Sequence, residues 1–320
     1  MGVFVLLGGI MKVKNKKLLI AVSVVLVLFL FCGVFLLCFF RIGGVSREEI
    51  APEVPRYNFD EKTDSVVRVM TFNIRCTNVG RASMLERIGI VSDTIMNSEA
   101  DSIGIQEATP FWIKSLRVAV DGKYAIVGEG RDGKNSGEYS AILYLKDKYN
   151  LIDSGTFWLS ETPDVPSKSW DAAFNRICTW AILENKETHE KYVHINSHFD
   201  HVGEKARTQS VKMILEKAKS YENIPVVFTA DMNVCEGTEN YLQFTSSNGF
   251  TDTKYIAENT MDFCTFHNLD PLGENEGNVI DYVMVNEFWG AKEYRVVTAG
   301  IDGAYVSDHF PVYADIYVKE

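Results

Sequence analysis

The sequence predicts an α/β (α+β) fold, a sandwich of mixed β-sheets flanked by helices and preceded by one transmembrane helix. From residue 66 onward, segments with helical periodicity alternate with strand-like segments, and some strand-like segments follow one another directly. A long apolar run near the N-terminus predicts the transmembrane helix. With 320 residues and 46% hydrophobic content, the chain can form one large domain with a substantial core.

The apolar run covers residues 18–40 and follows a basic segment, residues 1–17. A helix needs roughly 20 apolar residues to cross a bilayer, whereas the apolar part of a cleavable signal peptide has about 7–15. No small-residue cleavage motif follows Phe40, so we expect an uncleaved signal anchor rather than a cleaved signal peptide. The length of the run also argues against a buried core helix. Four lysines before the run predict a cytoplasmic N-terminus and a catalytic domain outside the cell membrane.

Residues 41–64 contain Pro52, Pro55 and many charges, which is typical of a linker or stalk. Residues 65–320 then form one catalytic domain, which we expect to be monomeric. After residue 47 the chain holds 26 of its 32 basic residues and all 43 acidic residues. This negative charge repels a long polyanion such as DNA and mildly favours a small-molecule substrate.

Short apolar runs rich in β-branched and aromatic residues predict the strands of this domain. Repeats of apolar residues every three or four positions predict its helices, as at Met84, Ile88, Val91 and Ile95. Proline at position 110 suits the first turn of a helix. Strands are expected at 66–72, 102–106, 124–128, 139–145, 176–184, 192–197, 226–229, 279–285 and 310–318, and helices at 83–97, 110–118, 203–220 and 239–246.

Four cysteines lie in this domain, with no C-x-x-C spacing, so a zinc site is not expected. Two disulfides and four free thiols are both compatible with the sequence. The four are Cys76, Cys178, Cys235 and Cys264.

Polar residues able to bind metal or transfer protons stand where the expected strands end. An apolar strand can carry such a group past the sheet edge into a common cleft, and oxygen ligands with imidazoles suit a divalent cation and a phosphate ester. The pattern therefore predicts a metal-assisted phosphoester site. Its members are Asn73, Glu107, His198, Asp200, Asp231, Asn233, Asp281, Asp308 and His309.

The segments around these residues resemble the endonuclease/exonuclease/phosphatase superfamily (deoxyribonuclease I-like) over residues 66–318. The stretches GRDGKNSGEYSAILY, SGTFWLSETPD and NRICTWA are similar to a bacterial, secreted branch. The resemblance implies a four-layer α/β sandwich and a metal-dependent hydrolase acting on phosphate ester bonds. The motifs that carry it occur in the family's order at Thr71–Asn73, Gln106–Glu107, Ser197–His198, Ala230–Asn233 and Ser307–His309.

Three residues are candidates for holding Mg²⁺, or Mn²⁺ in its place. Glu107 follows a buried strand and is expected to be the principal ligand, because Mg²⁺ binds one or two carboxylates and keeps several waters. Asp308 is expected to be a second metal or water ligand. Asn73 cannot ionise, so it would orient the metal or the scissile phosphate through hydrogen bonds.

The remaining motif residues are candidates for catalysis. Asp231 and Asn233 lie two positions apart in an extended segment, so both can face the cleft. We expect Asp231 to activate the attacking water and Asn233 to bind a phosphate oxygen. His309, oriented by Asp281, would stabilise the transition state or protonate the leaving oxygen. His198 is similar to the family's other phosphate-binding histidine.

Three positions depart from the family pattern. Ala230 and Met232 replace a common glycine and a common phenylalanine, which is expected to alter only packing. Nucleases of the exonuclease III type have an acidic residue two positions after the asparagine of the first motif, and this chain has Arg75 there. Further candidates for substrate contacts are Arg176, Asp200, His201, His267 and Trp170.

The expected function is therefore that of a membrane-anchored, outward-facing, Mg²⁺-dependent phosphoesterase that hydrolyses a phosphate monoester or diester. A nuclease acting on DNA or RNA is an alternative, and so is a sphingomyelinase-like lipid phosphodiesterase, since the anchor holds the site near lipid. A non-enzymatic binding module is disfavoured, because such a module would be expected to lack Glu107, Asp231 or His309, and all three are present.

Overall fold

The computed structural model describes residues 2–6, 9–13, 59–80, 82–246, 249–269, 278–298 and 306–320. The chain divides into two units, Met1–Val54 and Pro55–Glu320. In the first unit, β1 (Gly2–Leu6) and β2 (Gly9–Val13) pair as an antiparallel hairpin.

The expected transmembrane segment, residues 18–40, lies outside the described residues, as does the linker as far as residue 58. Within the described parts of the chain, no helix is both long and apolar enough to cross a membrane. The transmembrane helix therefore stays a prediction.

Two mixed β-sheets form the second unit. One has six strands in the order β11–β13–β10–β9–β8–β7, and the other has seven in the order β12–β14–β15–β3–β4–β6–β5. The strands are β3 (Val67–Asn73), β4 (Ser102–Ala108), β5 (Tyr124–Val127), β6 (Tyr139–Leu145), β7 (Tyr149–Trp158), β8 (Ile177–Asn185), β9 (Lys191–His198), β10 (Val226–Asp231), β11 (Thr251–Asp252), β12 (Ala257–Thr260), β13 (Asp281–Val285), β14 (Trp289–Val296) and β15 (Val312–Val318).

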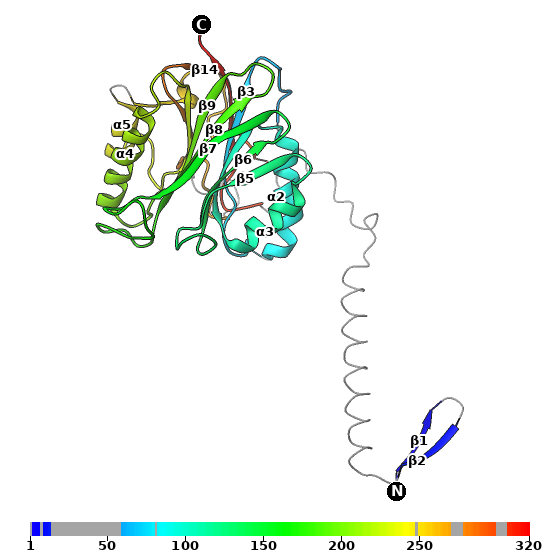
Figure 1. Cartoon of the computed structure of the whole chain (residues 1–320). Helices are drawn as coiled ribbons and strands as arrows, with labels where there is room; N and C mark the ends of the chain where they lie inside the picture. The colour runs from blue at the N-terminus through cyan, green and yellow to red at the C-terminus, as the bar shows by residue number, and fades with distance from the viewer. Residues whose placement is uncertain are drawn as a thin grey trace. The chain divides into compact units, whose positions relative to one another are not determined.

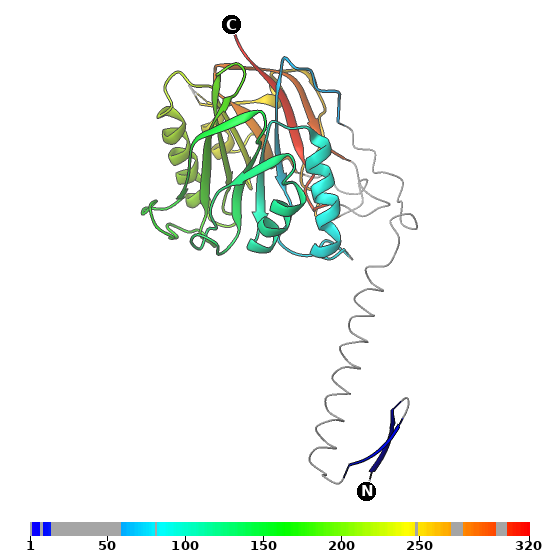
Figure 2. The ribbon, with the colours of Figure 1, turned by 45° about the vertical axis from the view of Figure 1, so that its right-hand side comes forward.

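Helices cover the outer side of each sheet. Helices α2 (Met84–Ser98) and α3 (Pro110–Ala119) lie on one side, and α4 (Glu204–Lys219) and α5 (Glu239–Thr245) on the other (Figure 1). The same layers are visible after a turn of 45° (Figure 2). The four-layer α/β sandwich predicted from the sequence is thus confirmed.

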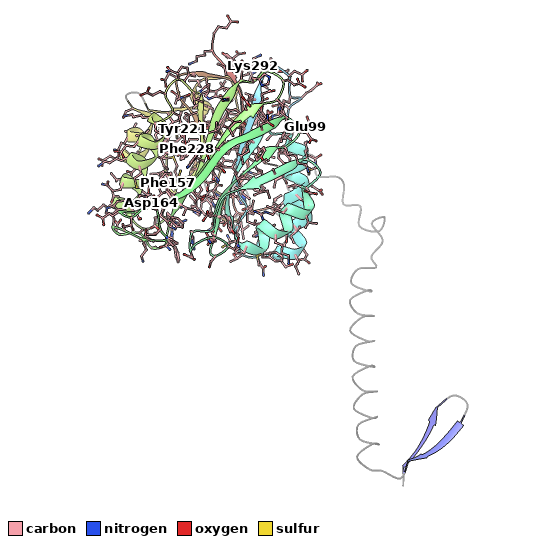
Figure 3. All side chains as sticks on the ribbon, viewed as in Figure 1. Glu99, Phe157, Asp164, Tyr221, Phe228 and Lys292 are labelled. Atoms are coloured by element: carbon pink, nitrogen blue, oxygen red, sulfur yellow. The ribbon has the colours of Figure 1, made fainter. Side chains whose placement is uncertain are left out.

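Three apolar clusters hold the layers together. The first joins α2 and α3 to the seven-stranded sheet, through residues such as Ile95, Trp112 and Ile103. The second lies between the two sheets. The third joins α4 and α5 to the six-stranded sheet around Phe228, which is labelled in Figure 3, and which packs against Phe244 with ring centroids 4.6 Å apart.

The helix starts follow from local sequence. Ser83 caps α2 in a capping box with Glu86, and the Thr109 side chain caps α3 ahead of Pro110.

Each predicted helix occurs within one or two residues of its expected bounds. In the second unit, strands β7, β11, β12 and β14 were not predicted. Strands β7 and β14 each contain a β-bulge and charged or glycine residues, which break the regular alternation that marks a strand. Strands β11 and β12 have only two and four residues, too few to show an alternation.

A buried polar network links the two sheets beneath the strand ends. The Asn196 amide donates to the carbonyl oxygens of Ile105 and Ala141, at 3.0 and 2.9 Å. Its oxygen accepts from Gln106 Nε2 at 2.8 Å and from Thr229 Oγ1 at 3.0 Å. Because buried polar groups are costly when unpaired, this network fixes how β4 lies against β9 and β10.

Gly104 leaves the space that this network needs. A Cβ there would lie 2.5 Å from Asn196 Oδ1 and closer still to Thr229 Oγ1. Gly104→Ala is therefore expected to lower the free energy of unfolding by about 1–3 kcal/mol, the usual cost of overpacking, as measured by chemical denaturation. The control is Gly89→Ala, because Gly89 lies on the exposed face of α2 and an added Cβ there meets nothing within 4 Å. Alanine favours helix, so the control should be neutral or stabilising. Equal stability of Gly104→Ala and wild type would contradict the close fit.

Candidate active site

A cavity of about 290 Å³ opens at the edge where β9 and β10 end and β13 begins. Among the described residues, its lining brings together most of the candidates from the sequence motifs. The lining residues are Cys76, Glu107, Arg131, Glu138, Phe174, Arg176, His198, His201, Asp231, Asn233, Phe266, Ile280, Asp308 and His309.

Strand register brings the motif residues together. Asp231 is the last residue of β10, and it pairs with His198 of β9 on one side and with Asp281 of β13 on the other. Asn73 ends β3 and pairs with Gln106 of β4. Since strand pairing fixes which residues are neighbours, residues far apart in the sequence meet at one sheet edge.

Three residues at this edge adopt left-handed backbone conformations that are uncommon outside glycine. They are Arg75 (φ 54°), Glu107 (φ 60°) and Asn233 (φ 49°). Glu107 also lies in an irregular part of β4, between Ile105 and Ala108. Such conformations cost of order 1–3 kcal/mol each and cluster at functional sites, where they re-aim side chains.

Asn73 is fully buried and connects the candidate catalytic groups. Its Nδ2 donates to Asp231 Oδ2 at 2.9 Å and to Glu107 Oε1 at 3.2 Å, and lies 3.4 Å from His309 Nε2. Its oxygen accepts from the backbone N of Arg75 at 3.0 Å. The amide therefore presents its donor, not its oxygen, to the carboxylates. This arrangement favours a positioning role for Asn73 over the metal-ligand role predicted from the sequence.

His309 and Asp281 form the pair expected from the sequence. His309 Nδ1 lies 2.9 Å from Asp281 Oδ2, and both residues are buried. Burial alone would lower the pKa of His309, but the negative charges of Asp281 and Asp231 outweigh it and raise this pKa to about 10. The imidazole is then protonated at neutral pH and presents Nε2 toward Asp231 Oδ2, 3.8 Å away.

Asp231 lies at the centre of this group. Burial and the negative charge of Asp281 raise its pKa to about 7, although His309 and Asn73 act in the opposite direction. A carboxylate with a pKa near neutrality is suited to take a proton from water. Asp231, Asp281 and His309 also offer ligand atoms within 4.8 Å of one another, a group that could hold a metal ion. The contact of His309 Nδ1 with Asp281 Oδ2 orients the imidazole, which also suits this trio to proton transfer.

Glu107 is the better candidate for a metal ligand. Burial would raise its pKa, but the Cys76 backbone N, which donates to Oε2 at 2.8 Å, and the Asn73 amide together lower it. Glu107 is therefore ionised, and it faces the cavity with Asp308. Ionised carboxylates at a water-accessible wall are the ligands that Mg²⁺ and Mn²⁺ prefer.

Arg75 pairs with Asp308 through its Nη1. This guanidinium stands where exonuclease III-type nucleases have an acidic residue, so it neutralises a carboxylate of the site instead of adding one. The departure seen in the sequence thus reduces the negative charge available for metal ions at this wall.

His198 and Asn233 form the opposite side of the site. Asn233 Nδ2 lies 3.1 Å from His198 Nε2, and that nitrogen lies 3.4 Å from Asp231 Oδ2. Burial and the nearby cations Arg176 and His309 hold the pKa of His198 well below its usual range. A neutral imidazole beside an amide can donate a hydrogen bond to a phosphate oxygen.

The further candidates from the sequence fall into two groups. Arg176 and His201 line the cavity. Asp200, Trp170 and His267 are not among its lining residues. Asp200 is 1% exposed and lies behind Arg176, where its carboxylate organises the adjacent loops. Their position outside the lining does not support direct contact of these three residues with the substrate, so such contact stays a prediction.

Six lining residues were not among the predicted site residues: Cys76, Arg131, Glu138, Phe174, Phe266 and Ile280. Three of the six lie in or next to stretches that the sequence analysis had noted. Arg131 and Glu138 belong to GRDGKNSGEYS, and Phe174 immediately precedes NRICTWA. The signal available was only the resemblance of these stretches to a bacterial branch.

Among the cysteines, Cys76, Cys178 and Cys235 carry free thiols. Burial raises the pKa of Cys76 to about 12, so it is not an activated thiol.

Solved structures of other proteins share this fold. No protein-family model matches the chain, and a search of curated proteins finds no match. An endonuclease/exonuclease/phosphatase from Bacteroides vulgatus is 35% identical, with a TM-score of 0.75 over 81% of this chain and 100% of that one. A mannosyl-6-phosphatase from Bacteroides thetaiotaomicron is 33% identical, with a TM-score of 0.72 over 78% of this chain and 99% of that one.

A more distant protein shows the same fold. The catalytic domain of human Nocturnin is 17% identical, with a TM-score of 0.65 over 82% of this chain and 97% of that one. At this identity the likeness concerns the fold alone. The bacterial relatives, which this chain covers almost completely at 33–35% identity, decide the assignment. The chain therefore belongs to the endonuclease/exonuclease/phosphatase family and is a hydrolase acting on phosphate esters.

Proposed function

We propose that the chain is a Mg²⁺-dependent phosphatase that hydrolyses the phosphate monoester of a small molecule. The observation that carries the proposal is the contact of Asn73 with both Glu107 and Asp231, beside His309, at the wall of a 290 Å³ cavity. That volume is just below the usual range for small-molecule sites, about 300–1,000 Å³, and so suits a small substrate. The similarity to a mannosyl-6-phosphatase supports a hexose 6-phosphate as the first substrate to test.

The charges of the cavity support a metal requirement. Among its described lining residues are four carboxylates, two guanidiniums and the His309 imidazolium, so the charges nearly cancel and give a dianionic phosphate no net attraction. Glu107 and Asp308 would hold a divalent cation, which would supply the positive charge that phosphoryl oxygens need. The residues present therefore fit Mg²⁺, with Mn²⁺ as its nearest substitute.

Each remaining group has a role in hydrolysis by water. Asp231 takes a proton from the attacking water as its oxygen bonds to phosphorus, and the bond from phosphorus to the leaving oxygen breaks. The His309 imidazolium, held by Asp281, stabilises the charge of the transition state or protonates the leaving oxygen. His198 and Asn233 hydrogen-bond the phosphoryl oxygens.

A substrate panel tests this function. The purified full-length chain with Mg²⁺ is expected to release inorganic phosphate from mannose 6-phosphate or a related monoester. It should act much more slowly on bis(p-nitrophenyl) phosphate, DNA, RNA and sphingomyelin. Equal phosphate release by a mock preparation from cells that lack the chain would reveal a contaminating phosphatase. Cleavage of DNA, RNA or sphingomyelin without action on any monoester would refute the proposal in favour of a phosphodiesterase.

We also propose that residues 18–40 anchor the enzyme in the cell membrane with its catalytic domain outside. The support is the apolar run itself and the lysines that precede it. Protease added to intact bacterial cells that express the full chain should remove the catalytic domain and leave the anchor in the membrane fraction. If the domain were protected in intact cells and in cells stripped of their outer envelope, and digested only after lysis, the catalytic domain would lie in the cytoplasm. That result would contradict the proposed orientation.

A further inference from the structure

Beside the catalytic groups, the cavity has an outer wall formed by Arg131, Glu138, Phe174 and His201. Phe174 is 47% exposed, so part of its apolar surface is open to a ligand at the mouth of the cavity. Its ring lies against the His201 ring, with centroids 5.8 Å apart and an interplanar angle of 22°, and the Arg131 guanidinium lies 4.7 Å from its centroid. The wall therefore offers aromatic surface next to hydrogen-bonding groups.

This wall is held in place by groups behind it. Asp200 Oδ2 accepts from the backbone N of Ala173 at 3.0 Å and of Phe174 at 3.2 Å. On the other side, the Arg131 carbonyl oxygen accepts from Trp158 Nε1 at 2.6 Å and from Asn175 Nδ2 at 3.4 Å. A preformed wall loses little conformational entropy when a ligand binds, so these contacts suit a binding role.

The guanidiniums near this wall are already paired with carboxylates. Arg131 lies 2.8 Å from Glu138, and Arg176 lies 3.3 Å from buried Asp200. Paired guanidiniums attract a further phosphate weakly, while their remaining N–H groups can still donate hydrogen bonds. Glu138 accepts hydrogen bonds and repels anions. The wall thus favours a neutral, hydroxyl-rich group over the second phosphate of a nucleic acid backbone.

We infer that Phe174, with Arg131, Glu138 and His201, forms a subsite that binds the neutral pyranose ring of a sugar phosphate and so determines specificity for the leaving group. The inference rests on the phosphatase function proposed above. An aromatic side chain packs against the apolar C–H surface of such a ring, while Arg131 and Glu138 bond its hydroxyl groups. A nucleobase could also pack on Phe174, but it would offer few hydroxyl groups to this donor and acceptor pair.

Binding of unphosphorylated ligand tests the subsite without relying on turnover. Saturation-transfer NMR on the full-length chain should detect free mannose, and Phe174→Ala should weaken this binding about three- to tenfold, the range for loss of an aromatic contact. Phe174→Trp keeps an aromatic surface and should retain binding. The matched control is Ile152→Ala on β7, because Ile152 is also 47% exposed and does not line the cavity. Melting temperatures establish that all variants are folded.

Kinetics then separate ring recognition from phosphate chemistry. Phe174→Ala should raise KM for mannose 6-phosphate about three- to tenfold, and KM for glycerol 3-phosphate, which has no ring, by less than about twofold. Mannose binding that depends on Phe174, in a chain that hydrolyses no phosphate ester, would support the subsite and defeat the proposed function. Absence of mannose binding, or binding equal in wild type and Phe174→Ala, would overturn the subsite. So would Phe174-dependent binding of AMP without binding of mannose.

Discussion

Replacing Asp231 with asparagine is expected to lower kcat by about 10²–10⁴-fold, the range for loss of a general base. Asparagine keeps the shape of the side chain, and its oxygen can still accept from Asn73, but it cannot take a proton from water. Affinity for Mg²⁺ should change little, because Glu107 and Asp308 remain. Phosphate release at saturating substrate measures kcat, and a Mg²⁺ titration of activity measures the apparent metal affinity.

The matched control for this variant is Asp252→Asn. Asp252 is also buried, at 3% exposure, and burial raises its pKa to about 6, but it does not line the cavity. The control therefore removes a buried carboxylate elsewhere in the fold and should leave kcat unchanged. Near-normal kcat in Asp231→Asn would overturn the role of Asp231 as the base.

Replacing Glu107 with glutamine is expected to nearly abolish activity at low Mg²⁺, with partial recovery as Mg²⁺ rises. The variant keeps the shape of the side chain and one of the two oxygens that accept from Asn73 and Cys76, but it removes the negative charge that holds the cation. Wild type should lose its activity in EDTA and regain it with Mg²⁺ or Mn²⁺. Added Mg²⁺ should therefore restore part of the activity of Glu107→Gln but none of the activity lost in Asp231→Asn.

Glu236→Gln serves as the control for charge removal. Glu236 pairs with Lys254 outside the cavity, so its loss should not alter the dependence on Mg²⁺. Full wild-type activity after exhaustive chelation would contradict the metal requirement. A defect in Glu107→Gln that is the same at every Mg²⁺ concentration would assign Glu107 another role.

The sequence indicated which candidate residues lie together, because each of them lies in or next to a strand. Asp231 follows an apolar run and pairs in register with His198 and Asp281, so the strand pattern alone brings the three to one sheet edge. The pairing of His309 with Asp281 followed from the need of an imidazole for an orienting carboxylate. Strand direction and the side-chain alternation of strands are local properties, and local properties can be read from sequence.

Other features depend on the orientation of one side chain, on an unusual backbone conformation or on contacts between distant segments, and none of these could be predicted from the strand pattern. The amide of Asn73 turns its donor toward Glu107 because the backbone N of Arg75 occupies its oxygen. Glu107 is re-aimed by a left-handed backbone conformation that an ordinary strand pattern does not indicate. Phe174 owes its position to the carboxylate of Asp200, 26 residues further along the chain.

Arg75 was predicted only in part. Its departure from the nuclease pattern was visible in the sequence, but the partner of its guanidinium was not. The structure pairs it with Asp308, a predicted metal or water ligand. The consequence for the charge of the site follows only once both residues are placed at one wall.

We propose that Asp231 and His309 act together on one transition state in one metal-assisted site. Phosphate release by the double variant Asp231→Asn/His309→Ala, measured against both single variants under the same Mg²⁺ concentration, tests it most directly. Groups that act as a unit give strongly non-additive defects, so the double variant should be about as impaired as the worse single variant. A double variant whose defect equals the product of the two single defects would show that the residues act independently.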